Sequence, residues 1–285
     1  RRIPIVGMHH TAVGDVAYDR ISVSMGETFG VLSKKIMDFV TKKIYSMSEV
    51  VQAPSPQAQI YAENLYGRPT VLLPRGIDIL KFSPRHRTRT DEEVKLLYVG
   101  RIAKEKGVDF FFDAYDVSSD KPTLSDFPIT IVGDGGFFNQ VDEKIGHIHN
   151  VTLTGRLIND PTQGNYNLSQ SYANGDIFVY PSTNDTFGNT IQEAMASGLP
   201  VVSMNSLGAQ FLIEDGETGF IVDSRLKLIE RVRFLAENLI ERNRIGNNAR
   251  ESVQNRTWKS IFKLGLDQII DAQSKYQVRV YKTLG

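Results

Sequence analysis

Short apolar runs alternate with amphipathic segments through most of the chain. In the second half, runs of strand length occur at residues 94–102, 127–136, 150–156, 176–182, 200–204 and 219–223. Segments that read as helices lie between them, at residues 108–116, 137–148, 168–175 and 190–198. Apolar strands that alternate with helices are typical of a parallel sheet covered on both faces. The pattern therefore predicts an α/β fold, which two amphipathic helices close at 225–245 and 247–275.

The first 80 residues show the same alternation over a shorter length. A strand and loop are expected in "IPIVGMHHT", and helices over residues 29–49 and 56–67. Doubly wound domains usually need roughly 100 to 200 residues. We therefore expect an incomplete N-terminal Rossmann-like domain at 1–82, a polar linker at 83–93 and a C-terminal Rossmann-like domain at 94–250. The final segment, 251–285, is expected to pack back toward the N-terminal domain.

The charge balance and the absence of cysteine exclude several classes of function and of site. Lys+Arg and Asp+Glu both number 33, so the net charge is zero and bulk attraction to nucleic acid is not expected. The chain has no cysteine, which removes disulfides, thiol nucleophiles and Cys-based metal sites.

No apolar run approaches the roughly 18 residues of a membrane span. We expect a cytoplasmic protein. Four lysines beside the apolar stripe of the helix at 34–47 leave peripheral contact with a membrane surface as the alternative to a core helix with a wet basic face.

Four polar or glycine-rich loops each follow a predicted strand: "GRIAKEKG", "GDGG", "TGR" and "PSTNDTFG". Ligands of open parallel sheets bind at the carboxyl ends of the strands, near the point where the strand order reverses. These loops should therefore meet at one edge of the sheet and form a ligand site there. "GDGG" is only a fragment of the dinucleotide-binding turn, since the full G-x-G-x-x-G is absent.

The stretch "STNDTFGNTIQEAMASGLPVV" carries two acids, Asp185 and Glu193, around a predicted helix start near Gly188. A helix start presents free N–H groups and the positive end of its dipole, which suits a phosphate. One acid on either side of a bound diphosphate could accept hydrogen bonds from two sugar rings, as a nucleotide sugar would require. The alternative is an Asp cap on a core helix with a solvated Glu.

Two further groups of residues are candidates. Arg101 and Lys106 follow the strand at 94–102, and both side chains suit a diphosphate; a solvated basic loop is the alternative. His9 and His10 follow the first strand, where a histidine pair is more often structural.

Together these motifs resemble the retaining glycosyltransferases of family 4, which have the GT-B fold of two Rossmann-like domains facing a cleft. The similarity rests on "LPRGIDILKFSP", "LLYVGRIAKEKGVD", "IVGDGG", "LTGRL" and, most specifically, on the E-x7-E-like "DTFGNTIQEAMASGLPVV". It covers most of the chain, with the family's N-terminal Gly-rich loop and first strands missing. It implies transfer of a hexose from a UDP- or GDP-sugar to a lipid or glycan hydroxyl, without cofactor or metal.

The resemblance also implies roles for individual residues. His10, Arg101, Lys106 and Asp185 would be catalytic: the two cations would hold the donor diphosphate, and Asp185 would contact the transferred sugar. Asp185 replaces the usual Glu and is one methylene shorter, and the loop "NSLGAQ" replaces the more usual Gly-Gly pair.

The donor would be bound by a further set of residues. Glu193 would hold the ribose and the backbone of Leu157 would meet the base, while the remaining contacts would come from Gly133, Phe187, Gly188 and Asn189. Two other functions stay open. One is an inactive remnant that binds nucleotide sugars, and the other is a sugar-nucleotide epimerase of the same architecture.

Overall fold

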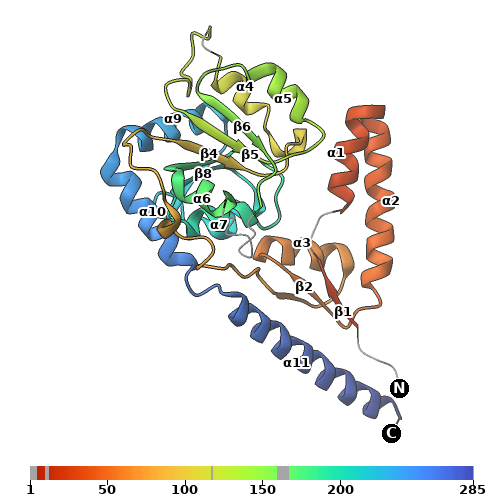
Figure 1. Cartoon of the computed structure of the whole chain (residues 1–285). Coiled ribbons are helices and arrows are strands. Elements are labelled where there is room, and N and C mark those ends of the chain that lie inside the picture. Colours follow the sequence, from red (N-terminus) through yellow and green to blue (C-terminus); the bar gives the residue numbers. More distant parts are fainter. Residues whose placement is uncertain (1–4, 10–12, 117, 159–166, 285) are drawn as a thin grey trace. The chain divides into compact units, whose positions relative to one another are not determined.

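The computed structural model describes residues 5–9, 13–116, 118–158 and 167–284. The chain forms two compact units, one of Arg1–Gly76 with Trp258–Gly285 and the other of Ile77–Thr257 (Figure 1). The polar segment 83–93 thus belongs to the second unit, and the final helix belongs to the first. The divisions fall after residues 76 and 257, where the sequence suggested 82 and 250.

The second unit is built on a six-stranded sheet in the order β6-β5-β4-β7-β8-β9, and every pair is parallel. Counted from the first strand of the unit, this is the 3-2-1-4-5-6 order of the doubly wound Rossmann fold. Each predicted apolar run contains one strand. The strands are β4 (Leu96–Val99), β5 (Ile129–Val132), β6 (Val151–Gly155), β7 (Ile177–Tyr180), β8 (Val201–Met204) and β9 (Gly219–Val222).

The two central strands explain the continuous apolar runs. Every residue of β4 and of β7 is buried, because helices cover a doubly wound sheet on both faces. The helices of this unit are α4 (Phe110–Ala114), α5 (Phe138–Ile145), α6 (Asn167–Asn174), α7 (Asn189–Ala196), α8 (Leu207–Leu212), α9 (Arg225–Glu237) and α10 (Leu239–Val253), with 3-10 turns η1 (Pro84–His86) and η2 (Lys104–Lys106).

Three helical details of this part of the chain differ from the sequence prediction. The segment "NSLGAQ" was expected to be a loop, but Ser206 caps α8 there by accepting a hydrogen bond from the Ala209 N–H at 3.2 Å. The predicted helix at 247–275 is interrupted between Val253 and Trp258, and the predicted helix at 225–245 is two helices, which meet at Asn238. Apolar periodicity continues across this junction and does not reveal the break.

The first unit has a three-stranded parallel sheet in the order β1-β2-β3. Its elements are β1 (Val6–Met8), β2 (Val50–Ala53), β3 (Thr70–Leu72), α1 (Val13–Met25), α2 (Glu27–Tyr45), α3 (Pro56–Tyr66) and α11 (Trp258–Leu284). Local signals define α3 well: the Ser55 hydroxyl accepts from the Ala58 N–H, and Gly67 ends the helix at φ 62°. Helix α1 was not expected, since its β-branched and polar residues form no clear stripe.

The long final helix is tied to this small sheet by hydrogen bonds of one glutamine. The Gln268 side-chain N–H donates to the Leu72 carbonyl at 2.8 Å, and its oxygen accepts from the Gln52 side chain at 3.0 Å. These bonds join residues about 200 positions apart and make α11 part of the first unit.

Candidate functional site

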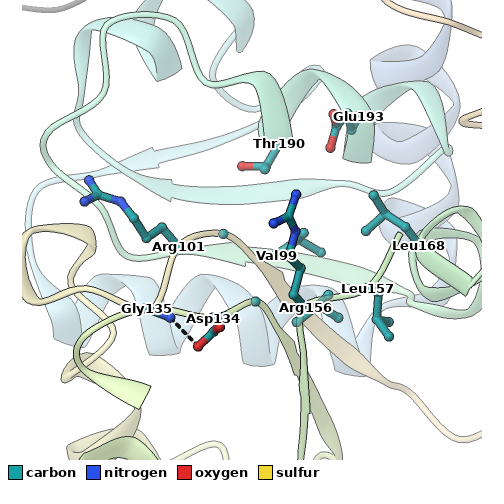
Figure 2. Close-up of a pocket in the computed structure, with 12 residues that line it drawn as sticks. Val99, Arg101, Asp134, Gly135, Arg156, Leu157, Leu168, Thr190 and Glu193 are labelled. Carbon is teal, nitrogen blue, oxygen red and sulfur yellow. Dashed lines mark hydrogen bonds between the residues drawn. The ribbon is translucent and has the colours of Figure 1, made fainter. Parts of the chain in front are cut away.

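A pocket of about 480 Å³ opens in the second unit at the point where the strand order reverses. The carboxyl ends of β4, β5 and β6 form one side, and α7, which follows β7, forms the other (Figure 2). This is where ligands of doubly wound folds bind. The lining residues are Val99, Gly100, Arg101, Val132, Gly133, Asp134, Gly135, Arg156, Leu157, Leu168, Thr190 and Glu193.

The glycine turn after β5 brings the strand ends close together. Gly133 has φ 145°, and a Cβ at this position would lie 1.8 Å from the Gly100 carbonyl oxygen. Backbone hydrogen bonds connect the turn to both neighbours, from the Gly133 N–H to the Gly155 carbonyl at 2.9 Å and from the Ile102 N–H to the Asp134 carbonyl at 3.0 Å. Only glycine fits this position, because any side chain would separate the two loops.

Glu193 reaches the pocket from the second turn of α7. Its Oε2 accepts a hydrogen bond from the hydroxyl of Tyr172 on α6 at 2.7 Å. Burial raises the pKa of Glu193 to about 7, although the Tyr172 hydroxyl and the charge of Lys81 act in the opposite direction. This carboxyl therefore changes charge near neutral pH, where a ligand hydroxyl would need it as an acceptor.

Asp185 is held by four donors from its own chain. Oδ2 accepts from the Lys106 ammonium at 2.9 Å and from the Tyr180 hydroxyl. Oδ1 accepts from the backbone N–H groups of Phe187 at 3.2 Å and Gly188 at 2.9 Å. Burial alone would raise the pKa of Asp185, but Lys106 and these hydrogen bonds outweigh it, so the pKa lies below its ordinary value.

The loop that ends at α7 consequently differs from the sequence expectation. The N–H groups of Phe187 and Gly188 form hydrogen bonds to Asp185, whereas the resemblance assigned these two residues to binding of the nucleotide-sugar substrate. The Phe187 ring is buried against Phe211, with centroids 5.9 Å apart. Asn189 begins α7, and the N–H groups of this first turn have no carbonyl acceptor within the helix. The start of α7 thus faces the pocket through Thr190, the next residue.

The cations are divided between the pocket and the loop beside it. Arg101 lines the pocket and is about half exposed, and its guanidinium pairs with Glu105 at 2.9 Å. Arg156 also lines the pocket and extends toward α7 in Figure 2. Lys106 lies outside the lining and binds Asp185 and the Asn184 carbonyl.

The structure therefore brings together Arg101, Gly133, Leu157 and Glu193 of the predicted residues, with Gly188 and Asn189 adjoining them. Arg156, Thr190 and Tyr172 had not been singled out. The signal for Arg156 was present, because it follows β6 as Arg101 follows β4. Tyr172 gave no such signal, since an apolar helix position explains it equally well.

The histidine pair belongs to the first unit. His10 lies outside the described residues, so its predicted catalytic role stays a prediction. His9 is buried, with Nδ1 3.0 Å from the Tyr66 hydroxyl and its ring stacked on Tyr61 at 5.7 Å. His9 therefore packs inside the first unit, as expected for a structural histidine.

The first unit has a cavity of its own, of about 630 Å³, where the strand ends meet α11. Its lining is mostly apolar and includes Met8, Ala53, Leu73, Trp258 and Phe262.

None of the helices in the described part of the chain has the length and apolar character that a membrane crossing requires. The same residues contain no group of three or more His, Asp or Glu side chains arranged to hold a metal ion.

Comparison with known proteins gives a consistent set of similarities. Residues 93–238 match a family model described as Glycosyl transferases group 1. Sulfoquinovosyl transferase of Arabidopsis thaliana is 31% identical over 200 residues, which are 65% of this chain and 37% of that protein. A GDP-mannose-dependent alpha-mannosyltransferase of Mycolicibacterium smegmatis is 32% identical over 269 residues, which are 88% of this chain and 66% of that protein. The chain thus spans less than two thirds of either relative.

A solved structure shares the fold. Anabaena HepE, crystallised with UDP and glucose, superimposes with a TM-score of 0.73 at 20% identity, over 93% of this chain and 71% of that one.

Proposed function

This chain belongs to the glycosyl transferases group 1 family, and on that premise we propose that it transfers a hexose, with retention, from a UDP- or GDP-linked donor to an acceptor hydroxyl. The observation that carries the proposal is the pocket at the reversal point of the sheet. It combines two guanidinium groups with a carboxylate and an open helix start, which together suit a nucleoside diphosphate.

The pocket suggests how a donor nucleotide would lie. Arg101 and Arg156 would pair with the phosphates, and Glu193 would accept hydrogen bonds from the ribose hydroxyls. The base would then lie toward Leu157 and Leu168, whose apolar side chains suit its faces. The relatives support this class of ligand, since one is named for GDP-mannose and the HepE structure contains UDP.

The proposed transfer breaks the bond between the anomeric carbon and the phosphate oxygen and forms a bond from that carbon to the acceptor oxygen. The acceptor's proton passes to the departing phosphate, and a nucleoside diphosphate leaves. Negative charge develops on the leaving group, so nearby cations lower the barrier. Lys106 and Arg101 are the proposed residues for this role, and His10 is proposed at the acceptor side.

In this scheme Asp185 would have two roles: it would hold the loop before α7 in place, and it would contact the transferred sugar. Its four intramolecular hydrogen-bond donors occupy both carboxylate oxygens, so a sugar hydroxyl must share an oxygen with one of these donors or replace it. We propose that Asp185 first of all holds Lys106 beside the start of α7, and contacts the sugar only by such sharing.

Lipids and glycans are the proposed acceptors, a cytoplasmic location is the proposed setting, and no metal is required in this scheme. A catalytically inactive nucleotide-sugar-binding remnant stays the second candidate, since both oxygens of Asp185, the proposed sugar contact, already accept hydrogen bonds within the chain. An epimerase of the same architecture would need a further acid-base pair at the sugar, and among the residues that the structure describes the lining offers only Asp134 and Glu193 as acids.

A donor panel tests the proposal. UDP-, GDP- and ADP-sugars are titrated into the 285-residue chain by calorimetry, and each is then incubated with candidate acceptor lipids and glycans while release of nucleoside diphosphate is followed. Binding and turnover of at least one donor are expected. Binding without turnover or hydrolysis of any donor would favour the remnant. Absence of binding by every donor would refute both.

A further inference from the structure

The hydrogen bond between Tyr172 and Glu193 has a consequence for ligand binding. We propose that Tyr172 is a positioning residue for the nucleotide: its hydroxyl holds one carboxylate oxygen of Glu193 so that the other is presented to the pocket. Tyr172 itself does not line the pocket. The inference rests on the proposed function, because it assigns Glu193 to a nucleotide ligand.

The two oxygens of Glu193 are in different situations. Oε2 accepts the Tyr172 hydroxyl at 2.7 Å, whereas Oε1 receives no hydrogen bond from the described residues. Glu193 lines the pocket, and Figure 2 shows its carboxyl on the same side as Thr190. Tyr172 thus holds Oε2 in place, and Oε1 is available to accept a hydrogen bond from a ligand hydroxyl.

Tyr172 is itself rigidly held, which makes it suitable for this task. The residue is fully buried on α6. Its ring packs edge-on against Phe82 at 5.4 Å and lies 5.9 Å from the ring of Phe178 on β7. Because the buried ring is packed against both neighbours, its hydroxyl has little room to move, and the Glu193 side chain that it holds loses less conformational entropy when a ligand binds.

The hydroxyl also acts on the charge of Glu193. Burial raises the pKa of this carboxyl, and the hydrogen bond from Tyr172 together with the charge of Lys81 partly reverses the effect. Within the described part of the chain, the other charged groups that line the pocket are Arg101, Asp134 and Arg156. Loss of the Tyr172 hydroxyl should raise the pKa of Glu193 further, so that more of it is protonated and unable to accept two hydrogen bonds at neutral pH.

The substitution Tyr172→Phe removes the hydroxyl and keeps the ring. Tyr115→Phe is a matched control, because Tyr115 is equally buried and donates to the Phe127 carbonyl at 2.8 Å, but does not line the pocket. Affinities for UDP and GDP are measured by calorimetry from pH 5.5 to pH 9 for the wild type and both variants. The Glu193 carboxyl is titrated in the same proteins by NMR, without ligand.

We expect nucleotide binding by Tyr172→Phe to be roughly five- to tenfold weaker at pH 7. Its affinity should reach half of the maximum at a higher pH than in the wild type, in step with a raised Glu193 pKa, and recover part of the loss near pH 9. Tyr115→Phe should match the wild type in both respects.

Two results would overturn the inference while leaving the proposed function intact. One is wild-type affinity and pH dependence in Tyr172→Phe. The other is an equal loss in both variants, since that would indicate a general loss of packing. If the wild-type chain binds neither UDP nor GDP at any pH, the proposed function fails and the inference fails with it.

Discussion

At the scale of single residues, the ionised form of the buried Glu193 lowers the stability of the fold. Its pKa is about 7 in the fold, against 4.5 for the free side chain, because burial disfavours the charged form. The stability that this raised pKa contributes is fully present below pH 4.5 and is lost as the pH rises toward 7. A buried acid with this property is typical of a residue kept for binding.

Glu193→Gln should therefore stabilise the chain and weaken the nucleotide complex. At pH 8 the free energy of unfolding should rise by about 1–3 kcal/mol, because the amide needs no ionisation, and the gain should vanish below pH 4.5. Urea unfolding at both pH values measures this, and nucleotide calorimetry should show at least a roughly fivefold weaker Kd. The exposed Glu92, changed to Gln, is the control. Equal or lower stability of Glu193→Gln at pH 8 would contradict the assignment.

At the scale of elements, an aspartate directly before β7 holds the polar segment that precedes β4 through ion pairs and a hydrogen bond. Asp176 Oδ1 pairs with Arg87 at 3.0 Å, and Oδ2 accepts from the Lys95 N–H at 2.8 Å and pairs with Arg89. The Asp176 side chain is 13% exposed, so these contacts are poorly screened by solvent. The polar segment 83–93, predicted as a linker, is therefore attached to the second unit along its C-terminal half.

Asp176→Asn should release this segment without unfolding the sheet. Tryptic cleavage after Arg87 and Arg89 should become at least roughly fivefold faster, since loss of the charged hydrogen bonds raises the population of the open segment. Peptide mass spectrometry over a time course measures the rate. The control is Asp91→Asn, because Asp91 also pairs with Arg89 but is 47% exposed, where ion pairs contribute little. Equal cleavage of the two variants would show that Asp176 does not hold the segment.

At the scale of the whole molecule, the chain has zero net charge but places cations where a diphosphate would lie. Arg101 and Arg156 line the pocket, and Lys106 stands beside it. These groups can neutralise a departing diphosphate through charge-assisted hydrogen bonds, which is the task that divalent ions perform in many phosphate-transferring enzymes.

Transfer by this chain should therefore be independent of divalent metal. Dialysis against EDTA should leave the rate with the preferred donor within about twofold of its original value, because the side-chain cations are sufficient. Adding Mg²⁺ or Mn²⁺ should produce no gain. The proposal would be wrong if EDTA abolished transfer and either metal restored it.

The predicted α/β class and the glycosyltransferase family are confirmed by the structural neighbour and the family match. The strands of the second unit were predictable because β4 and β7 are buried throughout and give continuous apolar runs. Helices α1 and α8 were missed: one has no clear apolar stripe, and the other contains six residues. The roles of the predicted site residues stay predictions, which the variants above address.

The sequence by itself determined the alternation of strands and helices along the second unit and the edge of the sheet where the loops meet. Both follow from local periodicity and from the common direction of parallel strands. Only the tertiary structure decided which hydrogen-bond donors surround the carboxylates of Asp185 and Glu193. Lys106 meets Asp185 across 79 positions and Tyr172 meets Glu193 across 21, and such pairings depend on how β4, α6 and α7 pack. For the same reason, the two acids of one short motif have opposite pKa shifts, since one is surrounded by donors and the other is mainly desolvated.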